Sequence, residues 1–171
     1  DEFYPISPKQ HNSFYNYVQK YYVEGFGLDA SKGLFINSDE IVLADGRHYS
    51  DVFSDGVIDL GLRYREPKSR EEELKQRSIF MIDDWCADYE QRIREKGGIG
   101  FFLGGIGPDG HIAFNVKGSD PYSTTRLTHT NFETQAAAAG DLGGIEISRH
   151  KPVITIGLDT ITYNRDAVAI I

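Results

Sequence analysis

A glycine-rich stretch in the middle of the chain brings an acid and an imidazole close together. Asp109 and His111 lie two residues apart in the run Gly-Gly-Ile-Gly-Pro-Asp-Gly-His-Ile-Ala-Phe-Asn, which begins at Gly104 and ends at Asn115. A carboxylate beside an imidazole favours its protonated form and fixes its tautomer, which suits proton transfer. Glycines allow backbone amides to approach a ligand closely. The stretch therefore predicts acid–base chemistry on a bound molecule.

The residues alone leave three other interpretations of this stretch open. Gly105, Gly107 and Gly110 have the spacing of a dinucleotide-binding fingerprint, but Pro108 and the residues after it do not begin an obvious helix. The acid and the imidazole are also metal-ligand types, although no third ligand has a metal-site spacing, and we expect no metal. The turn could equally be structural. The other histidines are interpreted as surface or capping residues: His11, His48, His129 and His150.

The elements around the stretch alternate between helix and strand. Apolar periodicity and capping signals predict helices over 9–26, 69–96 and 131–140, and continuous apolar runs predict strands over 33–37, 99–103, 153–157 and 167–171. Turn residues predict loops over 44–69 and 123–126. This order predicts an α/β fold with a mostly parallel sheet flanked by helices. The glycine-rich stretch then follows a buried strand at its carboxyl end, where open α/β sheets bind ligands.

Composition narrows the class of protein. The chain has 171 residues with 18 Lys and Arg against 26 Asp and Glu, a net charge of −8. That length suits one domain, and the acidic balance argues against nucleic-acid or anionic-membrane partners. No apolar run approaches the roughly 20 residues that span a bilayer. The single cysteine, Cys86, excludes an internal disulfide and suggests a cytoplasmic location.

The two ends of the sequence suggest a piece of a longer polypeptide. The chain opens on Asp1 without an initiator Met and closes on the apolar run 167–171, which reads as a buried strand. We therefore expect a fold truncated at both ends. The alternative is a small protein whose last strand lies at the edge of its sheet.

The stretch from Gly104 to Asn115 resembles the signature of the glucosamine-6-phosphate deaminase (isomerase) family, in the superfamily shared with 6-phosphogluconolactonases. Phe114-Asn115 favours the deaminase branch. The resemblance covers nearly the whole chain and extends to these further segments: Asp1-Glu2-Phe3, His11 to Tyr15, Tyr89 to Gly98, Gly118-Ser119, Thr125-Arg126-Leu127 and Val153 to Thr160.

The resemblance implies a single, partial Rossmann-like domain over 1–171 and a cofactor-free reaction. That reaction is the aldose–ketose isomerisation and deamination of an amino-hexose 6-phosphate, from glucosamine-6-phosphate to fructose-6-phosphate and ammonia. Asp1 matches the carboxylate that moves a proton between C2 and C1, His111 matches the ring-opening acid/base, and Asp109 matches the group that orients His111. Backbone amides near Gly105 and Gly107 would hold sugar oxygens.

The resemblance also suggests a second phosphate site and an assembly state. Ser119 and Arg126 resemble an allosteric phosphate site of some members, although an arginine that stabilises its loop is an equal interpretation. Oligomers are common in the family, so we expect a homo-oligomer that acts on a small sugar phosphate.

Two departures from the family pattern weaken the expected activity. The signature continues to Val116 and Lys117, where the family has Glu and Pro, so His111 lacks one carboxylate partner unless Asp120 replaces it. No Lys or Arg lies from Leu127 to Ser148, where the family's active-site phosphate arginine is expected. Other phosphate-binding groups of the family would precede or follow this sequence. A catalytically inactive sugar-phosphate-binding or regulatory module, or a 6-phosphogluconolactonase-type hydrolase, are therefore the alternatives.

Overall fold

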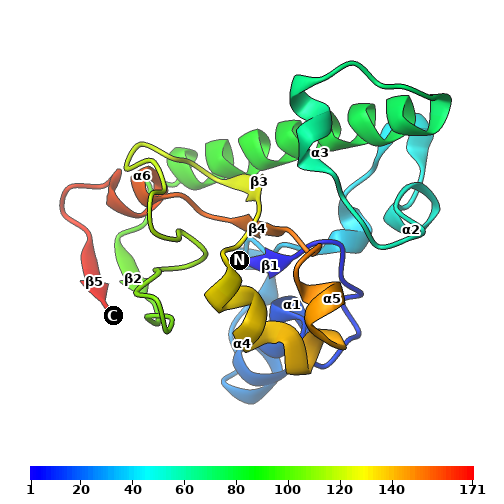
Figure 1. Cartoon of the computed structure of the whole chain (residues 1–171). Coiled ribbons are helices and arrows are strands. Elements are labelled where there is room, and N and C mark those ends of the chain that lie inside the picture. Colours follow the sequence, from blue (N-terminus) through cyan, green and yellow to red (C-terminus); the bar gives the residue numbers. More distant parts are fainter.

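A long helix crosses the molecule and covers one face of a small sheet (Figure 1). The computed structural model describes all residues 1–171. The helix, α3 (Arg70–Glu95), begins where the Ser69 hydroxyl accepts a hydrogen bond from the Glu72 amide, with three glutamates in its first turn. Gly97 and Gly98, at φ of 88° and 80°, end it. The prediction of a helix over 69–96 is confirmed.

Two small sheets replace the single, mostly parallel sheet that the sequence predicts. β1 (Glu2–Phe3), β4 (Val153–Thr155) and β3 (Arg126–Thr128) form an antiparallel sheet in the order β1-β4-β3. Only β2 (Phe101–Leu103) and β5 (Val168–Ile170) pair in parallel. The expectation of a mostly parallel sheet is therefore wrong, although the α/β class is confirmed.

The helices between β3 and β4 explain the antiparallel pairing. α4 (Phe132–Leu142) ends at Gly143 in the left-handed region, and α5 (Ile145–Ser148) follows directly and packs against α4. This compact pair returns the chain to the end of the sheet at which β3 stops, so β4 runs in the opposite direction. A parallel partner would need a crossover that returns the chain to the other end.

The first predicted helix is shorter than expected and changes type. Ser13 caps α1 (Phe14–Tyr17), so the helix begins at residue 14 and residues 7–12 form turns instead. From Val18 to Gly25 the chain forms a π-helix, η1. The predicted strand over 33–37 does not form, because this extended segment has no strand partner, although Ile36 is buried.

Short helices make up most of the remaining chain. They include a one-turn helix that His48 caps, which confirms the capping role predicted for that histidine. These elements are η2 (Ala30–Lys32), η3 (Ser38–Glu40), η4 (Ala44–Gly46), α2 (Tyr49–Val52), η5 (Leu60–Tyr64) and α6 (Leu158–Thr162). None of the helices combines the length and apolar character that a membrane crossing requires.

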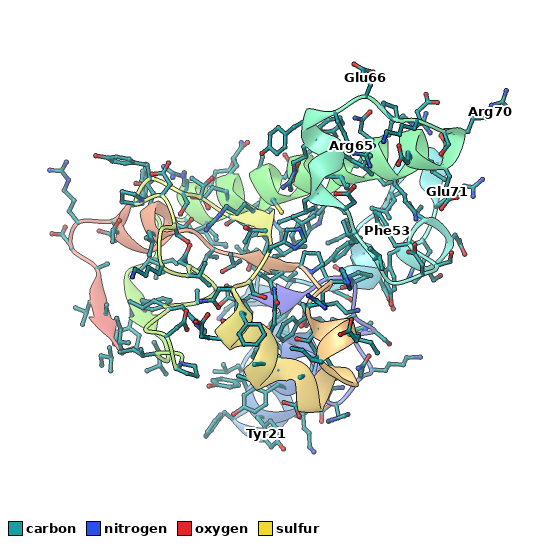
Figure 2. All side chains as sticks on the ribbon, in the orientation of Figure 1. Tyr21, Phe53, Arg65, Glu66, Arg70 and Glu71 are labelled. Carbon is teal, nitrogen blue, oxygen red and sulfur yellow. The ribbon has the colours of Figure 1, made fainter.

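The antiparallel sheet separates two apolar cores. Leu127 and Ile154, paired across β3 and β4, belong to the large core under α3, which also contains Phe53 from beside α2. Phe3 and Val153, paired across β1 and β4, belong to a smaller core that includes Leu142 of α4. Side chains fill these layers, whereas charged residues at the start of α3 point outward (Figure 2). The sheet is therefore fixed on both faces, which fixes the ends of β1 and β4.

The strands predicted over 99–103 and 167–171 form but are not buried on both faces. Phe101, Leu103, Val168 and Ile170 are each more than half exposed, and only Phe102 of β2 is buried. The reason is that β2 and β5 form a sheet of two strands alone, at one side of the molecule (Figure 1).

Candidate functional site

The glycine-rich stretch leaves β2 and folds back on itself as a compact loop. The amide of Gly107 donates to the carbonyl of His111 at 2.9 Å, and the amide of Gly110 donates to the carbonyl of Gly107 at 2.9 Å. Gly110 has a φ of 83°, in the left-handed region that glycine adopts most readily. Ile106 forms an isolated bridge with Ile112, which closes the loop at its base. The loop thus holds residues 107–111 in one defined turn.

Asp109 and His111 contact one another inside this loop. The His111 Nδ1 and Asp109 Oδ1 atoms are 2.5 Å apart, and the two side chains are only 12% and 10% exposed. The Nε2 atom of His111 has no hydrogen-bond partner in the chain, so this nitrogen is free for a ligand. An imidazole with one nitrogen bonded to a carboxylate and the other free is an arrangement suited to general acid–base catalysis.

Gly107 supports the His111 ring. Its amide already bonds to His111, so it does not offer a free donor to a sugar oxygen. A Cβ atom at this position would lie 2.0 Å from the His111 ring, so glycine is required for the ring to pack here. Gly105 lies in open space, and its predicted binding role stays a prediction.

Two residues at the start of α4 support the acid and the imidazole, and neither was predicted as a site residue. The side-chain amide of Asn131, which caps α4, donates to Asp109 Oδ2 at 2.5 Å. The Thr134 hydroxyl lies 3.3 Å from His111 Nδ1. Burial raises the pKa of Asp109, but hydrogen bonds from His111 and Asn131 outweigh it and hold that pKa below its usual value.

Asp1 reaches the same loop through β4. Its Oδ1 atom accepts hydrogen bonds from the Thr155 hydroxyl at 2.9 Å and from the Ile156 amide at 3.2 Å. The Thr155 hydroxyl oxygen in turn accepts from the amide of Phe114 at 3.0 Å. Asn115 donates to the carbonyl of Ile156 at 2.9 Å. One hydroxyl and one amide therefore tie the Asp1 carboxylate to the residues that follow His111.

A buried carboxylate next to Asp1 fixes the start of the chain. Glu2 is 1% exposed, and its oxygens accept from the Ser13 hydroxyl at 2.7 Å and from the amides of Phe14 and Tyr15 at 3.2 and 2.8 Å. These amides belong to the first turn of α1, where a negative charge is favourable. Glu2 therefore anchors β1 to α1 and limits where Asp1 can lie.

An apolar cavity adjoins Asp1 on the side of α1. Its volume is about 200 Å³, and aromatic side chains from α1, α3 and the extended segment before η3 dominate its walls. Phe14, Tyr15, Phe35 and Tyr89 line it together with Asp1. The carboxylate therefore has a largely apolar neighbourhood on one side, while Thr155 and the Ile156 amide hydrogen-bond to it.

Ser119 and Arg126 lie together, away from the His111 loop. Arg126 Nη2 is 3.5 Å from Ser119 Oγ, and both residues line a cavity of about 550 Å³ with Val116, Lys117 and Asp120. Burial lowers the pKa of Arg126, and the nearby Asp120 partly offsets this effect. The Arg126 guanidinium also donates to the carbonyl of Thr124 at 3.3 Å, as an arginine that stabilises its loop would do.

The structure does not place Asp120 as the missing carboxylate partner of His111. Its Oδ1 accepts from the amide of Tyr122 at 2.8 Å, and no hydrogen bond joins it to His111 or Asp109. The possibility that Asp120 replaces the family glutamate is therefore not supported, because Asp120 begins a turn that ends at Ser123 and lines the Arg126 cavity. No three His, Cys, Asp or Glu side chains converge as a metal site requires.

Comparison with solved structures defines the class of fold. A solved monomeric glucosamine-6-phosphate deaminase superposes with a TM-score of 0.63 over 98% of this chain and 53% of its own, at 21% identity. No protein-family model matches the chain. The molecule therefore has the α/β fold of that structure, of which it spans about half.

Curated proteins with similar sequences match part of the chain at higher identity. A glucosamine-6-phosphate deaminase of Caenorhabditis elegans is 43% identical over 86 residues, which are 50% of this chain and 32% of that protein. A glucosamine-6-phosphate isomerase of Candida albicans is 42% identical over 90 residues, or 53% and 36% of the two chains. The chain thus matches about a third of the length of these curated relatives. The sequence is thus similar to glucosamine-6-phosphate deaminases and isomerases over about half of this chain, which agrees with the resemblance of its glycine-rich stretch to that family.

Proposed function

We propose that residues 1–171 form one partial domain of an enzyme that isomerises and deaminates glucosamine-6-phosphate, giving fructose-6-phosphate and ammonia. The proposal is supported by the contact between Asp109 and His111 and by Thr155, whose hydroxyl donates to Asp1 and accepts from the amide of Phe114, three residues after His111. The names of the relatives support the substrate and the reaction. The proposal needs no cofactor, because carboxylates and an imidazole suffice for proton transfers between carbon and oxygen atoms.

In this mechanism His111 opens the sugar ring. Its free Nε2 removes the proton of the C1 hydroxyl and returns a proton to the ring oxygen, while Asp109 holds Nδ1 and stabilises the protonated imidazole. The product is an open-chain aldehyde with its amino group on C2. The backbone amide of Gly105, which stands in open space, is the proposed donor to a sugar oxygen.

Asp1 then carries the isomerisation step. Its carboxylate removes the proton from C2 and returns a proton to C1, while the C1 carbonyl oxygen gains a proton and the C2 amine loses one. The resulting C2 imine is hydrolysed by water to the ketone and ammonia. Thr155 and the Ile156 amide occupy one carboxylate oxygen, so the second oxygen is the proposed base.

The second phosphate site is proposed at Ser119 and Arg126, where Lys117 adds a cation to the cavity.

The test is a coupled assay of ammonia and fructose-6-phosphate formation from glucosamine-6-phosphate. We expect both products in equal amounts, and we expect His111→Ala to lower kcat by roughly 10²–10⁴. Absence of ammonia release from a panel of amino-sugar phosphates would refute the proposed reaction. Formation of 6-phosphogluconate when the protein is given 6-phosphogluconolactone would instead support lactone hydrolysis.

A second candidate is a sugar-phosphate-binding or regulatory module without catalytic activity. Val116 favours it, since this residue lines the Arg126 cavity and supplies no acid to His111. Binding of glucosamine-6-phosphate in calorimetry without turnover would support this candidate.

A homo-oligomeric state and a cytoplasmic location are also proposals. The single unpaired Cys86 supports the location.

A further inference from the structure

We propose that Asn131, at the start of α4, is the positioning residue that holds Asp109 against His111, in place of an acidic partner. Asn131 does two things with one side chain. Its Oδ1 accepts from the amide of Thr134 at 3.1 Å and caps the helix, and its Nδ2 donates to Asp109 Oδ2 at 2.5 Å. The role of this contact in acid–base catalysis rests on the proposed function, whereas the contact between Asn131 and Asp109 does not depend on that function.

The geometry explains why this contact matters for His111. Asp109 has two oxygens, and one of them contacts Nδ1 of His111 while the other receives Asn131. With both oxygens fixed, the carboxylate plane cannot rotate away from the imidazole. Thr134, held in the first turn of α4 by the same cap, lies 3.3 Å from Nδ1. The start of α4 thus fixes both members of the pair.

The neighbourhood of His111 leaves Asp109 as its one ionisable hydrogen-bond partner. From α4 the pair receives Asn131 and Thr134, neither of which titrates near neutral pH. Residue 116, where the resemblance places a glutamate, is a valine that lines another cavity. A neutral donor that keeps Asp109 ionised and oriented is therefore the support that this chain gives to the imidazole.

The test separates the contact to Asp109 from the helix cap. Asn131→Ser keeps a good capping residue but is too short to reach Asp109, and Asn131→Asp keeps the cap while it replaces the donor with a like charge. We expect either change to raise the pKa of Asp109, measured from its carboxyl ¹³C shift, because the carboxylate loses a hydrogen bond that favours its ionised form. We also expect the ¹⁵N shift of His111 Nδ1 to change, because its carboxylate partner is no longer held in place.

Asn37 provides a matched control. It caps η3 in the same way, accepting from the amide of Asp39 at 3.1 Å, and its Nδ2 donates to a carboxylate, Glu40 Oε1, at 2.9 Å. Asn37→Asp should leave the Asp109 and His111 signals unchanged. An Asn131→Ser protein with unaltered signals would show that Asn131 only caps α4, and would overturn the proposal.

The unmodified chain gives a second measurement in case a variant does not fold. The side-chain amide protons of Asn131 should shift with the same pH midpoint as the Asp109 carboxyl, because the two groups are bonded. Amide protons that do not follow that titration would also overturn the proposal. These readouts need no substrate, so their failure is distinct from an absence of ammonia release, which would refute the proposed reaction alone.

Discussion

The Asp1 carboxylate and the Thr155 hydroxyl lie 2.9 Å apart although 154 positions separate them in the chain. The same hydroxyl oxygen receives the amide of Phe114, three residues after His111. Thr155 is fully buried in β4, between the core under α3 and the core beside α4. One threonine thus joins the proposed carbon acid–base group to the loop of the proposed ring-opening group.

Thr155→Val should weaken this link while it preserves the volume of the side chain. The Phe114 amide would lose its acceptor, and we expect the free energy of unfolding to fall by about 1–3 kcal/mol. Thr155→Ser keeps the hydroxyl and should retain the position of Asp1. Urea unfolding measures the first effect, and ammonia release compares the two variants. Equal turnover in the valine and serine proteins would argue against a role of Thr155 in placing Asp1.

Gly107→Ala should displace the His111 ring, because the added Cβ would lie 2.0 Å from it. We expect the contact between His111 and Asp109 to be lost and the ¹⁵N shifts of the imidazole to change. Gly105→Ala is the matched control, since nothing lies within 4 Å of a Cβ built there. If both alanine variants kept the wild-type imidazole spectrum, the loop geometry described here would be contradicted.

Acid should remove the stability that Asp109 contributes. Its pKa is lowered in the folded chain, so its contribution is present above the unfolded value of about 3.9 and disappears as the pH falls through the lower folded value. Asp109→Asn lacks this group and should show a smaller loss of unfolding free energy on acidification. Denaturant unfolding at several pH values below 5 measures the difference. Identical pH dependence in the two proteins would contradict the assigned hydrogen bonds.

Glu2→Gln should destabilise the start of the chain. The glutamine amide would face the hydroxyl of Ser13 and the amides of α1, all of which now donate to the carboxylate. We expect a loss of about 2–4 kcal/mol in the free energy of unfolding, because buried donors would lose a charged acceptor. Glu24→Gln, an exposed change in η1, should alter stability by less than about 0.5 kcal/mol. Urea unfolding midpoints would distinguish the two.

The sequence predicted those features that depend on neighbouring residues. Ser69, the glutamates after it and the glycine pair at 97–98 define α3, and Asn131 marks the start of α4. The glycine-rich stretch predicted the loop with Asp109 and His111 on it. Each of these signals lies within a few residues of the feature that it specifies.

Contacts between segments that lie far apart in the chain could not be predicted from the sequence. β1 and β3 contain two and three residues, too few for a period-two pattern, and their pairing with β4 depends on segments far apart in the chain. The exposure of β2 and β5 follows from what packs against them and not from their own residues. The hydrogen bond from Asn131 to Asp109 joins residues 22 positions apart. The sequence therefore predicted that a helix begins at Asn131, but not that its side chain contacts Asp109.

Asp1 is the residue proposed to move the proton between C2 and C1 of the sugar. Ammonia release from glucosamine-6-phosphate, compared between the wild-type chain and Asp1→Asn, tests it most directly. Asparagine keeps an oxygen for Thr155 and the Ile156 amide but is no base at neutral pH. We expect turnover by the wild-type protein and a loss of roughly 10²-fold or more in Asp1→Asn. Equal rates in the two proteins, or no ammonia from either, would contradict it.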